Sequence, residues 1–194
     1  ADVLEKLGVN IEAPPETVEH CVQQVGLGFL FAPLLHRAMK HAIGPRRELG
    51  VRTVFNLLGP LTNPADARRQ VLGVYSTELV PKLADVLHRL NARKALVVCS
   101  RDGMDEFSIC DTSAVAEVDS DGVTEWECDP AELGLECADM SPLVTEGPDH
   151  SARIIRGILD GEEGPPRDIV ALNAGAAIYV GGEAADLEEG VEKA

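Results

Sequence analysis

Residues 70–99 read QVLGVYSTELVPKLADVLHRLNARKALVVC, and their pattern sets the architecture of the chain. Residues 70–75 predict a short buried strand. Residues 95–99 are apolar without alternation, which is typical of parallel strands covered on both faces. Between them, apolar residues recur at helical spacing and predict an amphipathic helix over 78–90. The apolar face of that helix is expected to hold Leu79, Leu83, Val86 and Leu90. This strand–helix–strand order is a βαβ unit.

The flanking sequence indicates the same α/β class. Residues 113–118 and 122–127 predict two strands joined by an Asp-Ser-Asp-Gly turn, which is a hairpin signal. Helices are expected over residues 15–26, 31–49, 149–159, 169–180 and 187–193. Gly44-Pro45 should break or kink the helix expected over 31–49. We therefore expect an α/β fold with a largely parallel sheet flanked by helices.

Composition excludes several classes of function. The formal net charge of -16 argues against a nucleic-acid partner, because surfaces that bind nucleic acid are basic. No apolar run approaches the roughly 18 residues expected of a membrane span, so no membrane partner is expected. Five scattered cysteines without a Cys-x-x-Cys pair indicate reduced thiols in a cytoplasm. Lysines number five against twelve arginines, and this acidic, lysine-poor composition predicts a halophilic protein, with a mesophilic acidic protein as the alternative.

A second informative stretch, residues 46–64, reads RRELGVRTVFNLLGPLTNP and carries three arginines within seven residues. A guanidinium is a planar fork of donors that fits a carboxylate or a phosphate. Arg46 follows the expected helix break at Gly44-Pro45, where a side chain can be aimed into a cleft. Arg46 is therefore a candidate anion ligand, and solvated arginines on a helix surface are the alternative.

An acidic loop follows the predicted strand 95–99, with residues 101–106 reading RDGMDE. Ligands of open α/β sheets bind outside the carboxyl ends of the strands. Asp105 and Glu106 are adjacent carboxylates that can bind a hard divalent cation, with water and substrate phosphates completing the shell. A solvated acidic turn is the alternative. Asp102, which precedes a glycine, is expected to form the turn.

These stretches, together with HRAM at 36–39, resemble the anthranilate phosphoribosyltransferase family from residue 1 to about residue 182. The run Arg-Thr-x-Phe-Asn-x-Leu-Gly-Pro-Leu-Thr-Asn-Pro is long and specific, whereas Asp-Gly-x-Asp-Glu by itself is weak. The resemblance implies a fold of the nucleoside phosphorylase/phosphoribosyltransferase type (glycosyltransferase family 3). It implies that 14–64 belong to a helical domain and that 1–13 with 65–194 form the α/β domain.

The resemblance also implies an activity and a site. The expected reaction transfers a phosphoribosyl group from phosphoribosyl pyrophosphate to anthranilate in tryptophan biosynthesis, with Mg²⁺ at Asp105 and Glu106. Arg46 matches the residue that contacts the anthranilate carboxylate. Asn173 and Gly175 match a family segment and are interpreted as packing residues, and no general base is identified. The wall of the anthranilate site is expected to hold His36, Met39 and Pro60, with simple helix packing as the alternative for His36 and Met39.

Family members are longer than this chain. Before a segment that resembles residues 1–5 they carry helices, a Gly-Thr-Gly-Gly-Asp phosphate loop and a Lys-His-Gly-Asn segment. We therefore expect this chain to be the C-terminal part of such an enzyme, inactive alone, within a homodimer of the intact enzyme. A pyrimidine nucleoside phosphorylase relative and a non-catalytic binding module on the same scaffold are the competing hypotheses.

Overall fold

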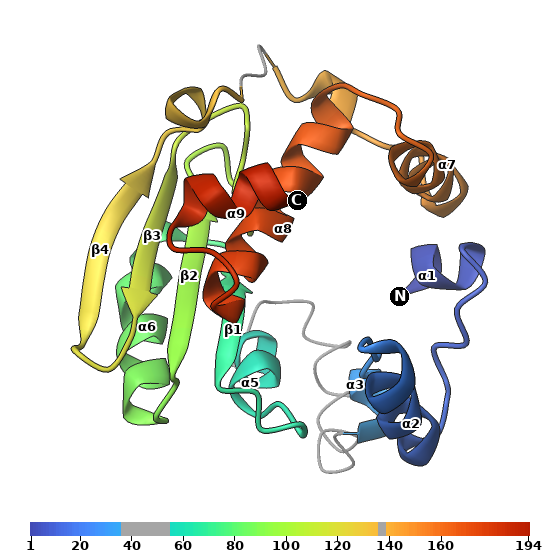
Figure 1. The fold of residues 1–194 in the computed structure, drawn as a ribbon, viewed down its shortest axis with the longest axis horizontal. Coiled ribbons are helices and arrows are strands. Elements are labelled where there is room, and N and C mark those ends of the chain that lie inside the picture. Colours follow the sequence, from blue (N-terminus) through green and yellow to red (C-terminus); the bar gives the residue numbers. More distant parts are fainter. Residues whose placement is uncertain (36–54, 136–138) are drawn as a thin grey trace. The chain divides into compact units, whose positions relative to one another are not determined.

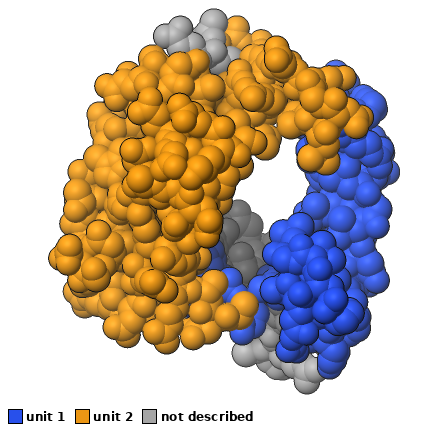
Figure 2. All heavy atoms as spheres, in the orientation of Figure 1, with its two compact units in different colours: residues 1–64, 145–157 blue, residues 65–144, 158–194 orange. Residues whose placement is uncertain are grey.

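The structure is a computed structural model that describes residues 1–35, 55–135 and 139–194. Contacts divide the chain into two compact units, residues 1–64 with 145–157 and residues 65–144 with 158–194 (Figure 2). Residues 1–13 thus group with the first unit. The division of the whole enzyme into a helical-domain segment and an α/β domain remains a prediction, because these units are defined by contacts within this chain.

The second unit contains a four-stranded sheet in the order β1-β2-β3-β4 (Figure 1). Strand β1 (Arg69–Gly73) pairs in parallel with β2 (Lys94–Ser100). The connection between them contains the 3-10 helix η2 (Thr77–Leu79) and helix α6 (Val80–Arg89), so the predicted βαβ unit is confirmed. Strands β3 (Ser113–Val118) and β4 (Val123–Cys128) form the predicted hairpin.

The α/β class is confirmed, but the sheet is mixed and only the β1–β2 pairing is parallel. The expectation of a largely parallel sheet is corrected here for the residues that the structure describes. Parallel neighbours require a long crossover, usually through a helix. The loop 101–112 contains no helix, so β3 starts at the edge where β2 ends and runs antiparallel to it.

Helices cover both faces of this sheet (Figure 1). Helix α6 packs on β2, β3 and β4, whereas α8 (Pro165–Gly181) packs on β1, β2 and α9 (Leu187–Lys193). Leu96 and Val98 of β2 join the core beneath α8, which includes its Leu172. Alternate residues of a strand point to opposite faces, and residues 95–99 of β2 are all apolar because both of its faces are covered.

The buried face of α6 differs from the predicted face. Val86 and Leu90 belonged to the predicted face but are 36% and 55% exposed. Leu83 belongs to both faces, but packing against the sheet buries the neighbouring apolar stripe of the helix, and the apolar period of the sequence does not select between two overlapping stripes. The buried residues of α6 are Val80, Leu83, Ala84 and Leu87.

The first unit is helical. Its elements are α1 (Asp2–Lys6), α2 (Pro15–Val25), α3 (Ala32–Leu35), α5 (Phe55–Leu61) and most of α7 (Pro148–Leu159). Helix α2 ends at Gly26, whose φ of 82° is the left-handed conformation that terminates many helices. The α1 and α7 helices are joined by an ion pair between Lys6 and Asp149 at 3.0 Å. The predicted helix over 31–49 is described only as far as α3.

The remaining features are a proline inside α5, the character of the helices, and two short 3-10 helices. Pro60 lies inside α5, whose last turn is closed by a 2.8 Å hydrogen bond from the Thr62 hydroxyl to the Leu58 carbonyl. None of the helices in the described ranges combines the length and the apolar character that crossing a membrane requires. The short 3-10 helices η3 (Pro130–Leu133) and η4 (Ser141–Leu143) complete the second unit.

Candidate functional site

The candidate site is the carboxylate loop, residues 101–108, which follows the carboxyl end of β2. It carries Asp105 and Glu106, both exposed. The loop begins at the edge of the parallel β1–β2 pair, where Val74 donates a backbone hydrogen bond to Val98 at 2.9 Å. This is the edge at which ligands of α/β sheets bind.

The carboxylate loop lies directly on the end of β1. A Cβ atom built on Gly73 would lie 1.6 Å from the Asp105 carbonyl oxygen, a distance that no real Cβ contact shows. Only glycine allows the Asp105 backbone to approach this strand so closely. The sequence analysis did not single out Gly73, although a glycine at the end of an apolar strand signals a close backbone approach.

Asp102 forms the turn of the carboxylate loop, as expected. One of its carboxylate oxygens accepts a hydrogen bond from the Met104 amide at 3.2 Å, and the other accepts one from the Ser108 hydroxyl at 2.6 Å. Burial alone would raise the pKa of Asp102, but hydrogen bonds from Ser108, Ser100 and the Met104 amide outweigh it and lower the pKa. The charged carboxylate is therefore the form that this loop conformation stabilises.

Asn173 of α8 also contacts this loop. Its Oδ1 accepts a hydrogen bond from the Phe107 amide at 3.1 Å, and its Nδ2 donates to the Phe107 carbonyl at 2.9 Å. The interpretation of Asn173 as a packing residue is therefore wrong. Its position in the sequence could have indicated this role, because an asparagine inside an apolar helix is unfavourable unless it forms specific hydrogen bonds.

Gly175, by contrast, does serve close packing. A Cβ built on it would lie 2.6 Å from the Val191 backbone nitrogen of α9. The two helices therefore touch through their backbones at this point. Gly190 stands on the facing side of the same contact, where a Cβ would lie 2.4 Å from the Gly175 carbonyl oxygen.

Asp105 and Glu106 form no ion pair and no side-chain hydrogen bond with any residue in the described part of the chain. Although much of Glu106 is exposed, partial burial of its carboxyl raises its pKa, and the neighbouring charge of Asp105 raises it further. Two adjacent carboxylates offer only oxygen atoms as ligands, and oxygen is the ligand that a hard cation such as Mg²⁺ prefers. Within the described ranges, no three His, Cys, Asp or Glu side chains gather into a complete metal cluster, so water or phosphate oxygens would supply the other ligands.

The residues expected to bind anthranilate are only partly described. Arg46, His36 and Met39 lie within 36–54, outside the described residues. Pro60 is exposed and belongs to the first unit, whereas the carboxylate loop belongs to the second. Of the predicted site residues, the structure brings together Asp105 and Glu106.

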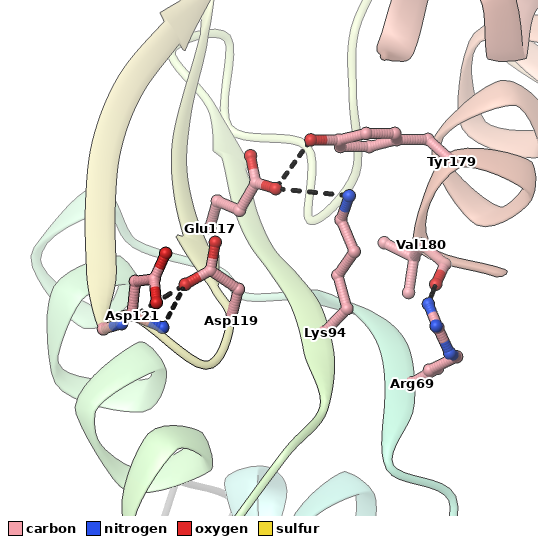
Figure 3. A network of polar contacts seen from close by, with 8 residues as sticks. Arg69, Lys94, Glu117, Asp119, Asp121, Tyr179 and Val180 are labelled. Atoms are coloured by element: carbon pink, nitrogen blue, oxygen red, sulfur yellow. Dashed lines mark hydrogen bonds and ion pairs between the residues drawn. The ribbon is translucent and has the colours of Figure 1, made fainter. Parts of the chain in front are cut away.

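The C-terminal half of α8 is held by a separate polar network (Figure 3). The Tyr179 hydroxyl donates to Glu117 Oε1 at 2.7 Å, and Lys94 Nζ lies 3.5 Å from the same oxygen. Lys94 Nζ also lies 3.3 Å from the centre of the Tyr179 ring. Burial raises the pKa of Tyr179, and the hydrogen bond to Glu117 raises it further, so the hydroxyl stays protonated and donates.

Arg69 completes this network at the end of the helix. Its guanidinium hydrogen-bonds to the Val180 carbonyl (Figure 3), one of the last carbonyls of α8, which lack partners within the helix. The contacts of Arg69, Lys94 and Glu117 tie α8 to β1, β2 and β3. Sequence analysis did not identify these pairs, because their members lie far apart in the chain.

This arrangement of a mixed sheet, two covering helices and an acidic loop at a strand end matches a known class. Residues 1–194 match the family model described as "Glycosyl transferase family, a/b domain", and the chain belongs to this family. Its relatives include the anthranilate phosphoribosyltransferase of Trichlorobacter lovleyi. That protein is 53% identical over 194 residues, which cover 100% of this chain and 56% of the relative.

Solved structures agree. Anthranilate phosphoribosyltransferase from Thermus thermophilus matches with a TM-score of 0.90 and 47% identity, over 98% of this chain and 56% of that one. The Saccharomyces cerevisiae enzyme in complex with PRPP and Mg matches with a TM-score of 0.88 and 29% identity, over 99% and 56%. The resemblance and the glycosyltransferase family 3 fold are confirmed, and the chain spans a little over half the length of these relatives.

Proposed function

We propose that this chain forms part of an anthranilate phosphoribosyltransferase. The enzyme would transfer the phosphoribosyl group of phosphoribosyl pyrophosphate to anthranilate, releasing pyrophosphate, as a step of tryptophan biosynthesis. The observation that carries the proposal is the pair Asp105–Glu106, exposed on a firmly held loop and without an ion-pair partner among the described residues. This pair lies in a chain that is similar over its whole length to enzymes of that name.

In the proposed site, Asp105 and Glu106 would hold Mg²⁺ together with phosphate oxygens of the substrate. The bound cation would supply positive charge against the negative charge that develops on departing pyrophosphate. The protein's own contribution is to hold two repelling carboxylates side by side. Gly73, Asp102 and Asn173 support the loop that carries them.

The anthranilate side of the site is proposed from the family resemblance. Arg46 would pair with the anthranilate carboxylate through two parallel hydrogen bonds, and this pairing would orient the weakly nucleophilic amine toward the sugar carbon. His36, Met39 and Pro60 would form the wall around the aromatic ring.

The setting of the enzyme completes the proposal. The formal net charge of -16 supports a protein adapted to strong salt, because a highly charged surface keeps a protein soluble. The same charge supports small-molecule substrates rather than nucleic acid. The scattered cysteines support a cytoplasmic location, where thiols stay reduced. A homodimer of the intact enzyme is proposed from the resemblance.

Turnover of anthranilate tests the function directly. We would assay a protein of the relatives' length that contains these 194 residues, following anthranilate fluorescence with phosphoribosyl pyrophosphate and Mg²⁺. We expect turnover that stops when EDTA removes the metal. The 194-residue chain alone should be inactive, since its acidic surface repels pyrophosphate unless a loop of backbone N–H groups offsets that charge.

The other hypotheses predict different outcomes when the same protein is also assayed for phosphorolysis of nucleosides and for ligand binding. Phosphate-dependent cleavage of uridine or thymidine, without consumption of anthranilate, would establish the nucleoside phosphorylase alternative. Ligand binding with neither reaction would establish the binding module. Rapid anthranilate turnover by the 194-residue chain would contradict the expectation that a further segment is needed.

A further inference from the structure

We infer that Asn173 is a positioning residue for the proposed metal site, holding Asp105 and Glu106 in place through the backbone of Phe107. This inference rests on the proposed function of the two carboxylates. Asn173 itself touches neither carboxylate in the described structure, so its action is indirect.

The Asn173 amide binds both backbone groups of a single residue, Phe107. Phe107 directly follows Glu106, and its N–H and C=O groups both bond to the Asn173 amide, at 3.1 Å and 2.9 Å. The Phe107 side chain is 0% exposed and belongs to the core that includes Leu172 of α8. A residue anchored by its ring and by both backbone groups cannot rotate, so it fixes the direction in which the preceding two residues leave the core.

The amide of Asn173 is itself held in one orientation. Nδ2 donates a further hydrogen bond to the Ile169 carbonyl, one turn earlier in α8, at 3.0 Å. A primary amide has two donors and two acceptor sites, and three of these four are used here. The bond to the helix backbone selects the side-chain rotamer, which aims the rest of the amide at Phe107.

Strand β1 gives the loop a second support. The Asp105 carbonyl lies against Gly73 so closely that no side chain fits between them. The strand therefore prevents the loop from moving toward β1, and any movement that separates Phe107 from α8 breaks the bonds to Asn173. These two contacts together restrain the backbone that carries the carboxylates.

Helix α8 is held to the sheet by core packing and by several polar contacts, so losing one of these contacts leaves its position unchanged. Tyr179, six residues beyond Asn173, is fixed by Glu117 and Lys94, and Arg69 bonds to the adjacent Val180 carbonyl (Figure 3). Groups behind the ligands of a metal orient them, and their loss costs about 10–100-fold in metal affinity or activity. Asn173 is such a group, because it orients the loop that carries the proposed ligands Asp105 and Glu106.

The test compares Asn173→Ala with Tyr179→Phe, which also removes side-chain hydrogen bonding from α8 but leaves the carboxylate loop untouched. Mn²⁺ would be titrated by electron paramagnetic resonance into the relatives'-length enzyme with phosphoribosyl pyrophosphate and without anthranilate, so that no turnover occurs. We expect Asn173→Ala to weaken Mn²⁺ binding about 10-fold or more. Tyr179→Phe should change it less than about twofold, even where its melting temperature falls as far.

Two further variants make every outcome decisive. If Asn173→Ala does not fold, Asn173→Leu keeps the branched side-chain shape and adds no charge, but loses all three hydrogen bonds. Weaker Mn²⁺ binding is expected in this variant too. Unchanged Mn²⁺ affinity in a folded Asn173 variant overturns the inference. Unchanged affinity in Asp105→Asn/Glu106→Gln instead overturns the proposed metal site itself.

Discussion

The carboxylates of the second unit occupy two contrasting environments. Glu117 is only 18% exposed and has Tyr179 and Lys94 as partners, at 2.7 Å and 3.5 Å. Asp105 and Glu106 are exposed, adjacent to each other, and have no ion-pair partner among the residues that the structure describes. In a chain of formal net charge -16, the acidic composition does not distinguish these roles, but the partners do.

The difference follows from the cost of burying charge. A carboxylate removed from water is stable only when hydrogen bonds and an opposite charge replace its hydration. Glu117 satisfies this condition and so contributes to the fold. Partial burial of the Glu106 carboxyl raises its pKa, and the charge of the neighbouring Asp105 raises it further, so a bound cation would offset both effects.

The largest expected effect comes from removing the two exposed carboxylates of the proposed metal site. Asp105→Asn with Glu106→Gln should lower turnover of the full-length enzyme by more than about 100-fold, since losing even the groups behind metal ligands costs about 10–100-fold. The melting temperature should stay equal or rise, because two repelling charges are removed. Steady-state rates against Mg²⁺ concentration and thermal melts measure both quantities.

A matched control uses another pair of exposed acids. Glu125→Gln with Asp121→Asn removes the same charge from the β3–β4 hairpin. Its turnover should stay within about twofold of the parent, because it lies outside the carboxylate loop. A comparable rate loss in both double variants would assign the effect to overall charge.

An intermediate effect is expected on the structural side. Glu117→Gln removes the charge that Lys94 pairs with, and should lower the free energy of unfolding by about 1.5–3 kcal/mol, the range for hydrogen bonds to charged groups. Urea denaturation of the 194-residue chain measures this change. The Mn²⁺ affinity of the full-length enzyme should not change.

A double-mutant cycle sharpens that prediction. Glu117→Gln and Tyr179→Phe share a contact, so their effects on unfolding should be non-additive. Additive losses would mean that the Tyr179 hydroxyl and Glu117 act independently. Weakened Mn²⁺ binding in Glu117→Gln would erase the distinction between the two carboxylate environments.

The smallest effect is that of salt on the repulsion among all the exposed acidic residues. Salt shortens the Debye length from about 10 Å at 0.1 M to about 3 Å at 1 M, so potassium chloride should screen repulsion and raise the melting temperature. Each kcal/mol of screened repulsion corresponds to about 2–4 °C for a chain of this size. The charge-reduced hairpin control should gain less, and a flat or falling melting temperature would contradict adaptation to salt.

Local pattern was sufficient for most elements. The βαβ unit, the 113–127 hairpin and the end of α2 at Gly26 follow from hydrophobic period and turn residues, which act over a few neighbours. The position of Asp105 and Glu106 beyond β2 follows from the same reasoning. The buried face of α6 was predicted wrongly because two overlapping apolar stripes share Leu83, and only packing against the sheet selects between them.

The sequence by itself determined the family, the α/β class and the two carboxylates, because each is written in contiguous residues. Only the tertiary structure decided that β3 runs antiparallel to β2, that Gly73 admits the Asp105 backbone, and that Asn173 holds Phe107. The partners Asn173 and Phe107 are 66 residues apart in the chain. Such contacts depend on how strands and helices pack in three dimensions, and no local pattern of apolar and polar residues encodes that distance.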